Sequence, residues 1–437
     1  MCPSYMVTRE EMHSTRGRSR LLFEMLNGAE IDGWHDEHVK EALDLCLACK
    51  GCKGECPMQV DMATYKAEFL SHYYEGKIRP PAAFAFGLIM YWSRFAAHAP
   101  WLANLMTQTP LLRDIAKLTV GIQPERQIPR YAPETFRHWF FNRPAKNPGG
   151  PDVILWADTF NNYFKPETAR AAVEVLEDAG YHVRVMREPL CCGRPTFDYG
   201  MLDQAKSLLS NVLETMRPEI RAGTRIVGLE PSCVSVFRDE LTELFPHDKD
   251  AMRLKNQTHL LSEFLMEQVK GYEPPKLNRK AVVHGHCHHK SLMGMGTEIG
   301  LLQKMGLDID EPDDGCCGMA GAFGLEKGAH YDVSTRLGER VLMPRVREAD
   351  SDTVIVANGF SCREQIRQMS NRKAMHLSEV LLMAKREGQS QPRLRPETHY
   401  VQTYRTPHLP VPAIAAAAGA ALVGAAIGLG LAGKRLR

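Results

Sequence analysis

The sequence lacks a charge excess, a nicotinamide-binding glycine pattern and a secretory signal peptide. Its 54 basic and 52 acidic residues leave a net charge of +2, so there is no basic field large enough to bind nucleic acid. No G-x-G-x-x-G follows an expected strand, which argues against a dinucleotide site in this chain. Because the opening residues do not resemble a signal peptide, we expect a cytoplasmic setting in which thiols stay reduced.

Cysteine, in contrast, is abundant, with 12 residues in 437. Four of them, Cys46, Cys49, Cys52 and Cys56, follow the pattern C-x2-C-x2-C-x3-C-P. This is the ligand run of bacterial 4Fe-4S clusters, and it makes electron transfer the leading interpretation. The alternative is a zinc site, but structural zinc is usually held by two spaced cysteine pairs.

The chain opens with Met1-Cys2-Pro3, which looks like the end of a second motif of the same kind. In two-cluster ferredoxins the fourth cysteine of each motif binds the other cluster. We therefore expect Cys2 to complete one 4Fe-4S cluster with Cys46, Cys49 and Cys52, leaving Cys56 for a second cluster. In the alternative arrangement, the four clustered cysteines share one cluster and Cys2 is a spare thiol.

Two lysines, Lys50 and Lys53, lie inside this ligand loop. Positive charge there would raise a cluster's reduction potential by stabilising the more negative reduced state. The alternative is that both are ordinary lysines of a solvated loop.

Hydrophobic periodicity divides the chain into an α-helical ferredoxin-like domain and a duplicated α/β Cys-Cys-Gly domain. The expected helices of the first domain are Arg18–Leu26, Asp36–Leu45, Met62–Tyr74 and Ala83–Ala97. The expected segments are 1–141 for the ferredoxin-like domain, 142–151 for a Pro/Gly linker, 152–270 and 280–385 for the two α/β units, 386–410 for a polar linker and 411–433 for an apolar helix.

The two α/β units repeat one pattern of strands and cysteines. Each begins with a short strand, passes through a Cys-Cys-Gly and has a later strand that ends near a single cysteine. The expected strands are Val153–Ala157 and Ile226–Leu229 in the first unit, and Ala281–Gly285 and Thr353–Ala357 in the second. Strand–helix–strand order favours parallel, helix-covered sheets, and such sheets carry their sites at the carboxyl ends of the strands.

The second unit offers four thiolates, Cys287, Cys316, Cys317 and Cys362, which suffice for one metal centre. The first unit offers three, Cys191, Cys192 and Cys233, because Thr159 stands where the second unit has Cys287. We expect a second iron–sulfur cluster, or zinc, in this domain. Buried cysteine pairs acting as small hydrophobic residues are the alternative. Zinc becomes an alternative because four histidines surround Cys287, namely His284, His286, His288 and His289.

Two apolar stretches raise the question of a membrane. Residues 411–433 are 23 residues without charge, long enough to span a bilayer, and we expect a transmembrane helix there. Pro80–Trp92 is uncharged but only 13 residues long, too short to span. For that stretch we expect core packing between the two domains rather than contact with a membrane surface or a quinone.

Several strings together resemble a known family. They are Met1-Cys-Pro-Ser-Tyr, Ser14-Thr-Arg-Gly-Arg, Ala42-Leu-Asp-Leu-Cys-Leu-Ala-Cys-Lys-Gly-Cys, Ala63-Thr-Tyr-Lys-Ala-Glu-Phe-Leu, Leu190-Cys-Cys-Gly-Arg-Pro, His284-Gly-His-Cys-His-His-Lys, Asp314-Gly-Cys-Cys-Gly-Met-Ala-Gly and Ala357-Asn-Gly-Phe-Ser-Cys-Arg-Glu. Over about residues 1–385 the chain resembles the iron–sulfur half of bacterial FAD-linked D-lactate and D-2-hydroxyglutarate dehydrogenases. More distantly it is similar to the anaerobic glycerol-3-phosphate dehydrogenase iron–sulfur subunit and the heterodisulfide reductase Cys-Cys-Gly domain.

The resemblance implies an electron-transfer module that receives electrons from FAD on a partner dehydrogenase chain and passes them to a quinone or a soluble acceptor. With the apolar tail, it implies a place on the cytoplasmic side of the cell membrane. The family's flavin-binding front is absent here, so we expect no dehydrogenase activity from this chain alone. The complete signature also ends in C-x2-C, whereas Val236 and Gly359 occupy the corresponding positions in the two units. A thiol–disulfide enzyme similar to heterodisulfide reductase and a truncated remnant of a larger fused oxidase are the alternatives.

Overall fold

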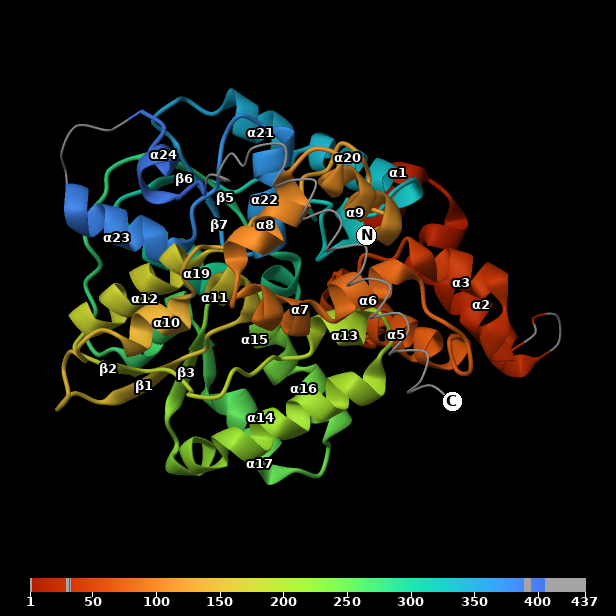
Figure 1. Ribbon diagram of the computed structural model, residues 1–437, viewed down its shortest axis with the longest axis horizontal. Helices are drawn as coiled ribbons and strands as arrows, with labels where there is room; N and C mark the ends of the chain where they lie inside the picture. The colour runs from red at the N-terminus through yellow and green to blue at the C-terminus, as the bar shows by residue number, and fades with distance from the viewer. Residues whose placement is uncertain (1, 29–30, 32, 389–393, 405–437) are drawn as a thin grey trace.

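We describe the chain from a computed structural model, which describes residues 2–28, 31, 33–388 and 394–404. Helices occupy the N-terminal third, and two small parallel sheets follow (Figure 1). The expected order, a helical region and then two α/β units, is confirmed.

The predicted transmembrane segment 411–433 lies outside the described residues. Within the described ranges, no helix combines the length and the hydropathy that a bilayer span requires.

Side-chain caps fix where the first helices begin. Ser14 accepts a hydrogen bond from the Gly17 N–H at the start of α2 (Thr15–Asn27), and Asp36 does the same for α3 (Glu37–Asp44). Asp61 caps α5 (Met62–Tyr73) through the N–H groups of Ala63 and Thr64. Such caps satisfy backbone donors that have no partner within the helix. The remaining helices of this region are α1 (Pro3–Thr8) and α4 (Gly51–Glu55).

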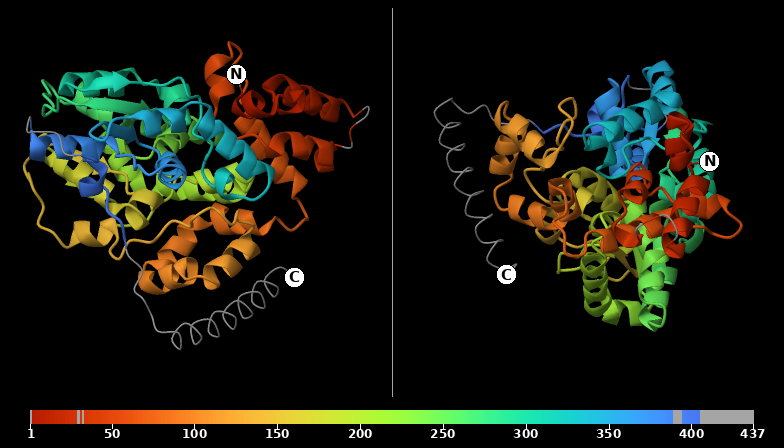
Figure 2. Two further views of the ribbon diagram at one scale, coloured as in Figure 1. Left: turned by 90° about the horizontal axis from the view of Figure 1, so that it is seen from above. Right: turned by 90° about the vertical axis from the view of Figure 1, so that its right-hand side faces the viewer.

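The helix expected at Ala83–Ala97 is in fact two helices. They are α6 (Pro81–Gly87) and α7 (Ile89–Ala96), separated at Leu88. Two further helices, α8 (Pro100–Gln108) and α9 (Leu112–Val120), complete a layer on one side of the molecule (Figure 2). The short α10 (Phe136–Phe141) then leads into the first α/β unit.

The first unit contains a four-stranded parallel sheet in the order β2-β1-β3-β4. Its strands are β1 (Asp152–Leu155), β2 (His182–Arg184), β3 (Arg225–Gly228) and β4 (Thr258–Leu260). Its helices are α11 (Thr159–Tyr163), α12 (Pro166–Asp178), α13 (Arg194–Asp198), α14 (Leu202–Ala222), α15 (Pro231–Arg238), α16 (Glu240–Leu244), α17 (Lys249–Gln257) and α18 (Leu261–Glu263).

The second unit repeats this plan with three parallel strands in the order β6-β5-β7. Its strands are β5 (Lys280–His284), β6 (Asp308–Asp310) and β7 (Val354–Ala357). Its helices are α19 (Gly296–Met305), α20 (Ala329–Arg340), α21 (Leu342–Glu348), α22 (Phe360–Met369) and α23 (Leu377–Glu387), and α24 (Glu397–Tyr400) follows.

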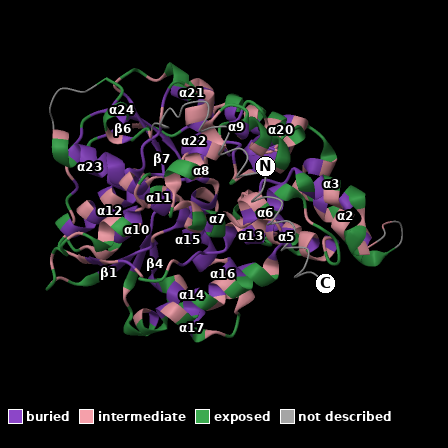
Figure 3. Ribbon diagram, in the orientation of Figure 1, coloured by how far each residue is buried: buried purple, intermediate pink, exposed green. Residues whose placement is uncertain are grey.

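Both sheets are covered on two faces, as their buried strands indicate (Figure 3). Alternate residues of β1 point to different cores: Val153 and Leu155 to a core that both units share, Ile154 to one formed with α14 and α17. The second sheet alternates in the same way, with Val283 in the shared core and Val282 in a separate one. This two-residue period is the geometry of a strand, and the shared core joins the two units.

The segment predicted as a polar linker, 386–410, includes packed residues. Glu397 is buried and forms an ion pair with Arg372 at 2.7 Å. Tyr404 donates a hydrogen bond to Glu167 at 2.6 Å. The described part of this segment is therefore attached to both α/β units.

Candidate functional site

Three groups of thiols are the candidate metal sites, and none of the 12 cysteines, all within the described residues, forms a disulfide. The first group includes Cys46, Cys49 and Cys52 of the loop before α4. Burial and the charges of Cys287, Cys2 and Cys46 raise the pKa of the Cys49 thiol well above its usual value. Burial also raises the pKa of Cys52, and the charges of Cys46 and Cys2 add to that shift. The charge of Cys2 thus acts on both of these thiols.

Cys56 lies apart from this group. Backbone N–H groups, first those of Val60 and Met58, lower the pKa of its thiol. No other cysteine contributes to that shift. This is the arrangement that ligand exchange between two motifs requires, although which thiols ligate a cluster stays a prediction.

Arg18, a residue that the ligand spacing does not point to, holds Cys2 in place. Its side chain is buried and donates to Cys2 Sγ at 3.1 Å, to Ser4 Oγ at 3.1 Å and to the Ala42 carbonyl at 2.7 Å. Despite burial, the Arg18 charge and the Ser4 hydrogen bond lower the pKa of the Cys2 thiol. Arg18 thus connects Cys2 and α1 to α3, the helix that precedes the ligand loop.

The second group, in the second α/β unit, comprises Cys287, Cys316, Cys317 and Cys362. Cys317 Sγ lies 3.5 Å from Cys362 Sγ. Hydrogen bonds between their thiols link Cys316 to both Cys287 and Cys317. Cys362 stands in the first turn of α22, directly after β7, and Cys287 follows β5. The site therefore lies at the carboxyl ends of two neighbouring parallel strands, where α/β sheets usually carry their sites.

Among the four neighbouring histidines, His284 has a ligand atom within 4.8 Å of those of Cys317 and Cys362. Its Nδ1 hydrogen bonds to the buried Asp314. Although burial opposes protonation, the Asp314 carboxylate raises the pKa of His284 to about 10. His286 packs against Gly359, and His288 Nε2 donates to the Ala48 carbonyl at 2.9 Å.

Gly359 and Val236 stand at the positions where the complete Cys-Cys-Gly signature would have a further cysteine. A Cβ at position 359 would overlap the His286 ring, so a side chain there would require that ring to move. Val236 is buried in the hydrophobic core that β1 forms with α14 and α17. Neither position offers a ligand to its site.

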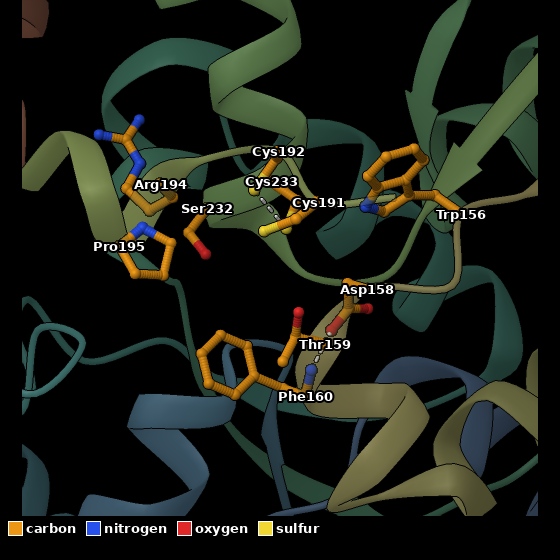
Figure 4. A pocket seen from close by; sticks show the side chains of 10 residues that line it. All are labelled: Trp156, Asp158, Thr159, Phe160, Cys191, Cys192, Arg194, Pro195, Ser232 and Cys233. Carbon is orange, nitrogen blue, oxygen red and sulfur yellow. Dashed lines mark hydrogen bonds between the residues drawn. The ribbon is translucent and has the colours of Figure 1, made fainter. Parts of the chain in front are cut away.

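The third group, in the first unit, comprises Cys191, Cys192 and Cys233. Cys192 Sγ and Cys233 Sγ are 3.0 Å apart, and the Thr159 side chain hydrogen bonds to the Cys191 thiol. Figure 4 shows the three cysteines on one side of a cavity and Asp158, Thr159 and Phe160 on the opposite side. Thr159 begins α11 directly after β1 and takes the place that Cys287 has in the second unit. This site therefore offers three thiols and a hydroxyl.

A left-handed glycine follows both cysteine pairs, with φ of +79° at Gly193 and +92° at Gly318. This conformation strains other residues. A Cβ at Gly318 would also overlap the Ser334 carbonyl. The glycine turns thus pass close to neighbouring helices, Gly193 beside Ala205 of α14 and Gly318 beside Ser334 of α20.

Glu230 links the two Cys-Cys-Gly sites, and the sequence reasoning missed it. It caps α15, which carries Cys233, by accepting from Ser232. It also accepts from the Phe360 N–H at 2.8 Å, at the start of the helix that carries Cys362. Burial, reinforced by the charge of Asp158, raises the pKa of Glu230 to about 7.

The ligand loop of the first group docks directly on both α/β units. Cys49 packs in the same apolar cluster as Cys287 and Cys316. A Cβ at Gly54 would lie 2.6 Å from the Ser291 carbonyl, so α4 approaches the second unit backbone to backbone. The first and second groups of thiols are therefore neighbours.

Lys50 is the centre of the contact with the first unit. Its side chain is fully buried, and Nζ lies 2.7 Å from Asp61, 2.6 Å from Asp239 and 2.9 Å from Glu240. Glu240 also pairs with Arg194, the residue after Cys191-Cys192-Gly193. Lys50 and Lys53 lower the pKa of Asp61 to about 2, although burial opposes this. The alternative of a solvated loop is therefore wrong for Lys50.

Lys53 belongs to the same network at its outer edge. Its Nζ lies 2.6 Å from Asp239 and 2.7 Å from Glu243. Four carboxylates therefore surround the two lysines, so their positive charge is balanced locally instead of acting unopposed on a cluster. None of the four carboxylates was predicted from the sequence, and three of them, Asp239, Glu240 and Glu243, come from a distant segment that begins directly after α15.

The residues fit iron–sulfur clusters as ligands. The first two groups each bring together four thiols, the donor type of 4Fe-4S clusters. Burial and mutual repulsion oppose ionisation of several thiols at once, a cost that a bound cation offsets.

Comparisons with known proteins agree with this chemistry. A family model described as 4Fe-4S dicluster domain matches residues 1–61. A second, described as cysteine-rich domain, matches residues 158–238 and 295–367. These matches support iron–sulfur clusters in both parts of the chain.

Three curated relatives span different parts of the sequence. D-2-hydroxyglutarate dehydrogenase from Pseudomonas putida is 26% identical over 87% of this chain and 41% of its own length. One subunit of the anaerobic glycerol-3-phosphate dehydrogenase from Escherichia coli is 25% identical over 65% of this chain and 72% of its own length. Lactate utilization protein A from Halalkalibacterium halodurans is 30% identical over 52% of this chain and 96% of its own length. The chain thus spans about two fifths of the first relative and nearly all of the third.

Proposed function

This chain, with its 4Fe-4S dicluster domain and its cysteine-rich domains, belongs to the lactate utilization protein A family, and on that premise we propose that it is an iron–sulfur electron-transfer module. It accepts electrons from FAD on a partner dehydrogenase chain and delivers them to a quinone or a soluble acceptor. The partner oxidises a D-2-hydroxy acid or glycerol 3-phosphate. The names of the relatives support these substrates.

The observation that carries the proposal is the contact between the first two groups of thiols. Cys49 and Cys287 pack against one apolar cluster that includes Cys316, so the two sites are neighbours within the fold. When bound, 4Fe-4S clusters supply one-electron transfer. The chain's own residues hold the ligand loop in position: Arg18 orients Cys2, and Lys50 joins the loop to the first unit.

The primary test is metal content and magnetic resonance on anaerobically purified protein. We expect at least about four irons per chain and a low-temperature paramagnetic signal that Cys49→Ser removes. Cys317→Ser should alter the signal of the second site while sparing that of the first, so each variant is the control for the other. Zinc without iron after careful reconstitution would contradict the proposal.

The partner is tested separately. Reduced flavoprotein of the D-2-hydroxy-acid or glycerol-3-phosphate type should reduce the iron of this chain, and the chain alone should oxidise neither substrate. The partnership is wrong if no flavoprotein co-purifies and no added flavoprotein reduces the protein.

Disulfide reduction at Cys317 is the second candidate. Hydrogen bonds from Cys316, Cys362 and His284 lower the pKa of Cys317 well below its usual value, which favours a thiolate. However, Cys317 is 1% exposed, whereas reactive thiols are normally accessible. Disulfide reductase activity that Cys317→Ser abolishes would favour this candidate.

For localisation, we propose attachment to the cytoplasmic face of the cell membrane through residues 411–433. Their 23 uncharged residues support this. Deleting 411–437 should release the protein from membranes and leave electron transfer to a soluble dye intact. Full-length protein that stays wholly soluble after lysis would contradict the attachment.

A further inference from the structure

Helices α6–α9 carry a large apolar surface on the outer side of the molecule. Each helix presents large hydrophobic side chains to solvent, such as Ile115 and Leu118 of α9, whose spacing of three residues puts them on one side of that helix. Leu111, directly before α9, is exposed as well. We call the whole set the outer face, and it comprises Phe84, Tyr91, Trp92, Phe95, Trp101, Leu102, Leu111, Ile115 and Leu118. The two views of Figure 2 show these helices as a layer on one side of the fold.

The inner side of the same layer is firmly packed. Ala83, Met90 and Leu105 are buried, and Arg94 donates to the Pro189 carbonyl of the first unit. Asn104 exchanges two hydrogen bonds with the backbone of Tyr131, at 2.8 and 2.9 Å. The core packing expected for Pro80–Trp92 thus holds for one side of these helices only, and the outer face is a fixed surface.

The outer face is poor in charge and rich in aromatic residues. Residues 80–120 contain only four charged side chains. One of these, Lys117, is buried and donates to the Pro124 carbonyl at 2.6 Å. The Trp92 indole N–H donates to the Phe84 carbonyl at 2.9 Å, which leaves its ring free for apolar contact. Continuous apolar surfaces of this kind mark interaction sites, and Trp and Tyr are enriched where proteins meet the membrane–water interface.

The position of Tyr404 indicates what this surface contacts. The Tyr404 carbonyl accepts from Arg130 at 3.0 Å, and the next residue, Tyr131, is the one bonded to α8 through Asn104. Only six residues separate Tyr404 from the uncharged segment 411–433, a reach of at most about 25 Å. Tyr404 therefore lies near α8, one of the helices of the outer face, within that reach of residue 411.

We propose that the outer face lies on the surface of the lipid bilayer, with Trp92, Phe95 and Trp101 at the level of the lipid headgroups and upper acyl chains. This inference rests on the membrane attachment proposed above and adds a second contact, which the attached chain makes. It would orient the protein on the membrane, with α6–α9 between the bilayer and the first α/β unit.

The test uses the full chain and vesicles of phosphatidylcholine and phosphatidylglycerol whose acyl chains carry bromine. Bromine quenches tryptophan at close range, so bound protein should lose part of its emission. The double variant Trp92→Phe/Trp101→Phe should lose that quenching while still sedimenting with the vesicles, because the remaining tryptophans lie outside the outer face. Unchanged quenching in this variant would overturn the proposal.

Matched substitutions test the energetics of the contact. Phe95→Glu and Leu118→Glu, at side chains 72% and 77% exposed, should each reduce the bromine quenching of Trp92 and Trp101 by roughly half or more, because a carboxylate opposes apolar contact with the bilayer. Phe23→Glu and Leu26→Glu are the controls, since they lie on α2 at 58% and 70% exposure and should be quenched as the unaltered protein is. Equal quenching of all four variants would refute the contact.

Two further outcomes distinguish the occupants of this surface. Binding without any tryptophan quenching would mean that residues 411–433 attach the protein while its own segment, a second copy or a partner covers the outer face. That result would refute this inference and leave the proposed attachment standing. Absence of all vesicle binding would refute both, whereas the iron and resonance measurements would still test electron transfer.

Discussion

Replacing Lys50 with methionine removes the only positive charge that lies fully inside the contact between the ligand loop and the first α/β unit among the described residues. Lys50 Nζ lies within 2.9 Å of carboxylates from Asp61, Asp239 and Glu240. Methionine keeps a similar length and apolar character. The substitution therefore tests the charge rather than the packing.

The magnitude follows from burial. Removing one partner of a buried ion pair costs about 3–5 kcal/mol, because it leaves the other charge buried without compensation. Here Lys53 still contacts Asp239 and Arg194 still contacts Glu240. We therefore expect a loss at the lower end, about 3 kcal/mol, which raises the probability of opening this contact roughly hundredfold, since 1.4 kcal/mol is a factor of ten.

Hydrogen–deuterium exchange measures this opening directly. Backbone amides of α4 (Gly51–Glu55) and α16 (Glu240–Leu244) should exchange faster in Lys50→Met, while those of β5 and β7 should not change. Lys53→Met is the control in the same loop. Its partner Glu243 is 42% exposed, so we expect a loss of about 1 kcal/mol there.

The reasoning is refuted if Lys50→Met folds and its α16 amides exchange at the rate of the unaltered protein. It is also refuted if Lys53→Met has the larger effect. Either result would mean that the buried network does not hold the loop against the first unit.

Further substitutions test the thiol sites. Cys2→Ser should reduce the iron of the first site more than Cys56→Ser, and the opposite order would mean that the four clustered cysteines share one cluster. Arg18→Met removes a charged donor 3.1 Å from Cys2 Sγ, a loss of about 2 kcal/mol, and should shorten the lifetime of the resonance signal in air; an unchanged lifetime would contradict this. Gly359→Ala forces a methyl group into the neighbouring imidazole and should lower iron binding at the second site. Gly300→Ala meets nothing within 4 Å and should leave iron binding unchanged; equal losses would point to general instability instead.

The ligand groups and turns of each site could be predicted from the sequence, because they depend on residue types and on short spacings between them. The Cys46–Cys56 run, the two Cys-Cys-Gly turns and the alternation of strands are all properties of neighbouring residues. Even Thr159 as the counterpart of Cys287 followed from the repeat, and the structure places its hydroxyl at the Cys191 thiol.

Contacts between segments that are distant in the sequence could not be predicted in this way. Lys50 looked like either a tuning charge or a solvated residue, and its partners Asp239 and Glu240 lie almost two hundred residues away. Likewise, Pro80–Trp92 is evenly apolar in sequence, and only the packing of α6 and α7 decides which of its side chains are buried and which face outwards.

The sequence by itself determined which donors each site offers, because thiols at fixed spacing select their metal chemistry, and it determined the parallel α/β plan, because hydrophobic period and strand order do. Tertiary structure alone decided that Arg18 contacts Cys2 and that Lys50 lies among carboxylates of the first unit. It alone placed Cys49 beside Cys287 and Cys316 and left no room for a ligand at Gly359. The physical reason is that burial and charge pairing act between segments that come into contact only in the folded chain. The distance between two such segments along the sequence does not indicate whether they will be in contact.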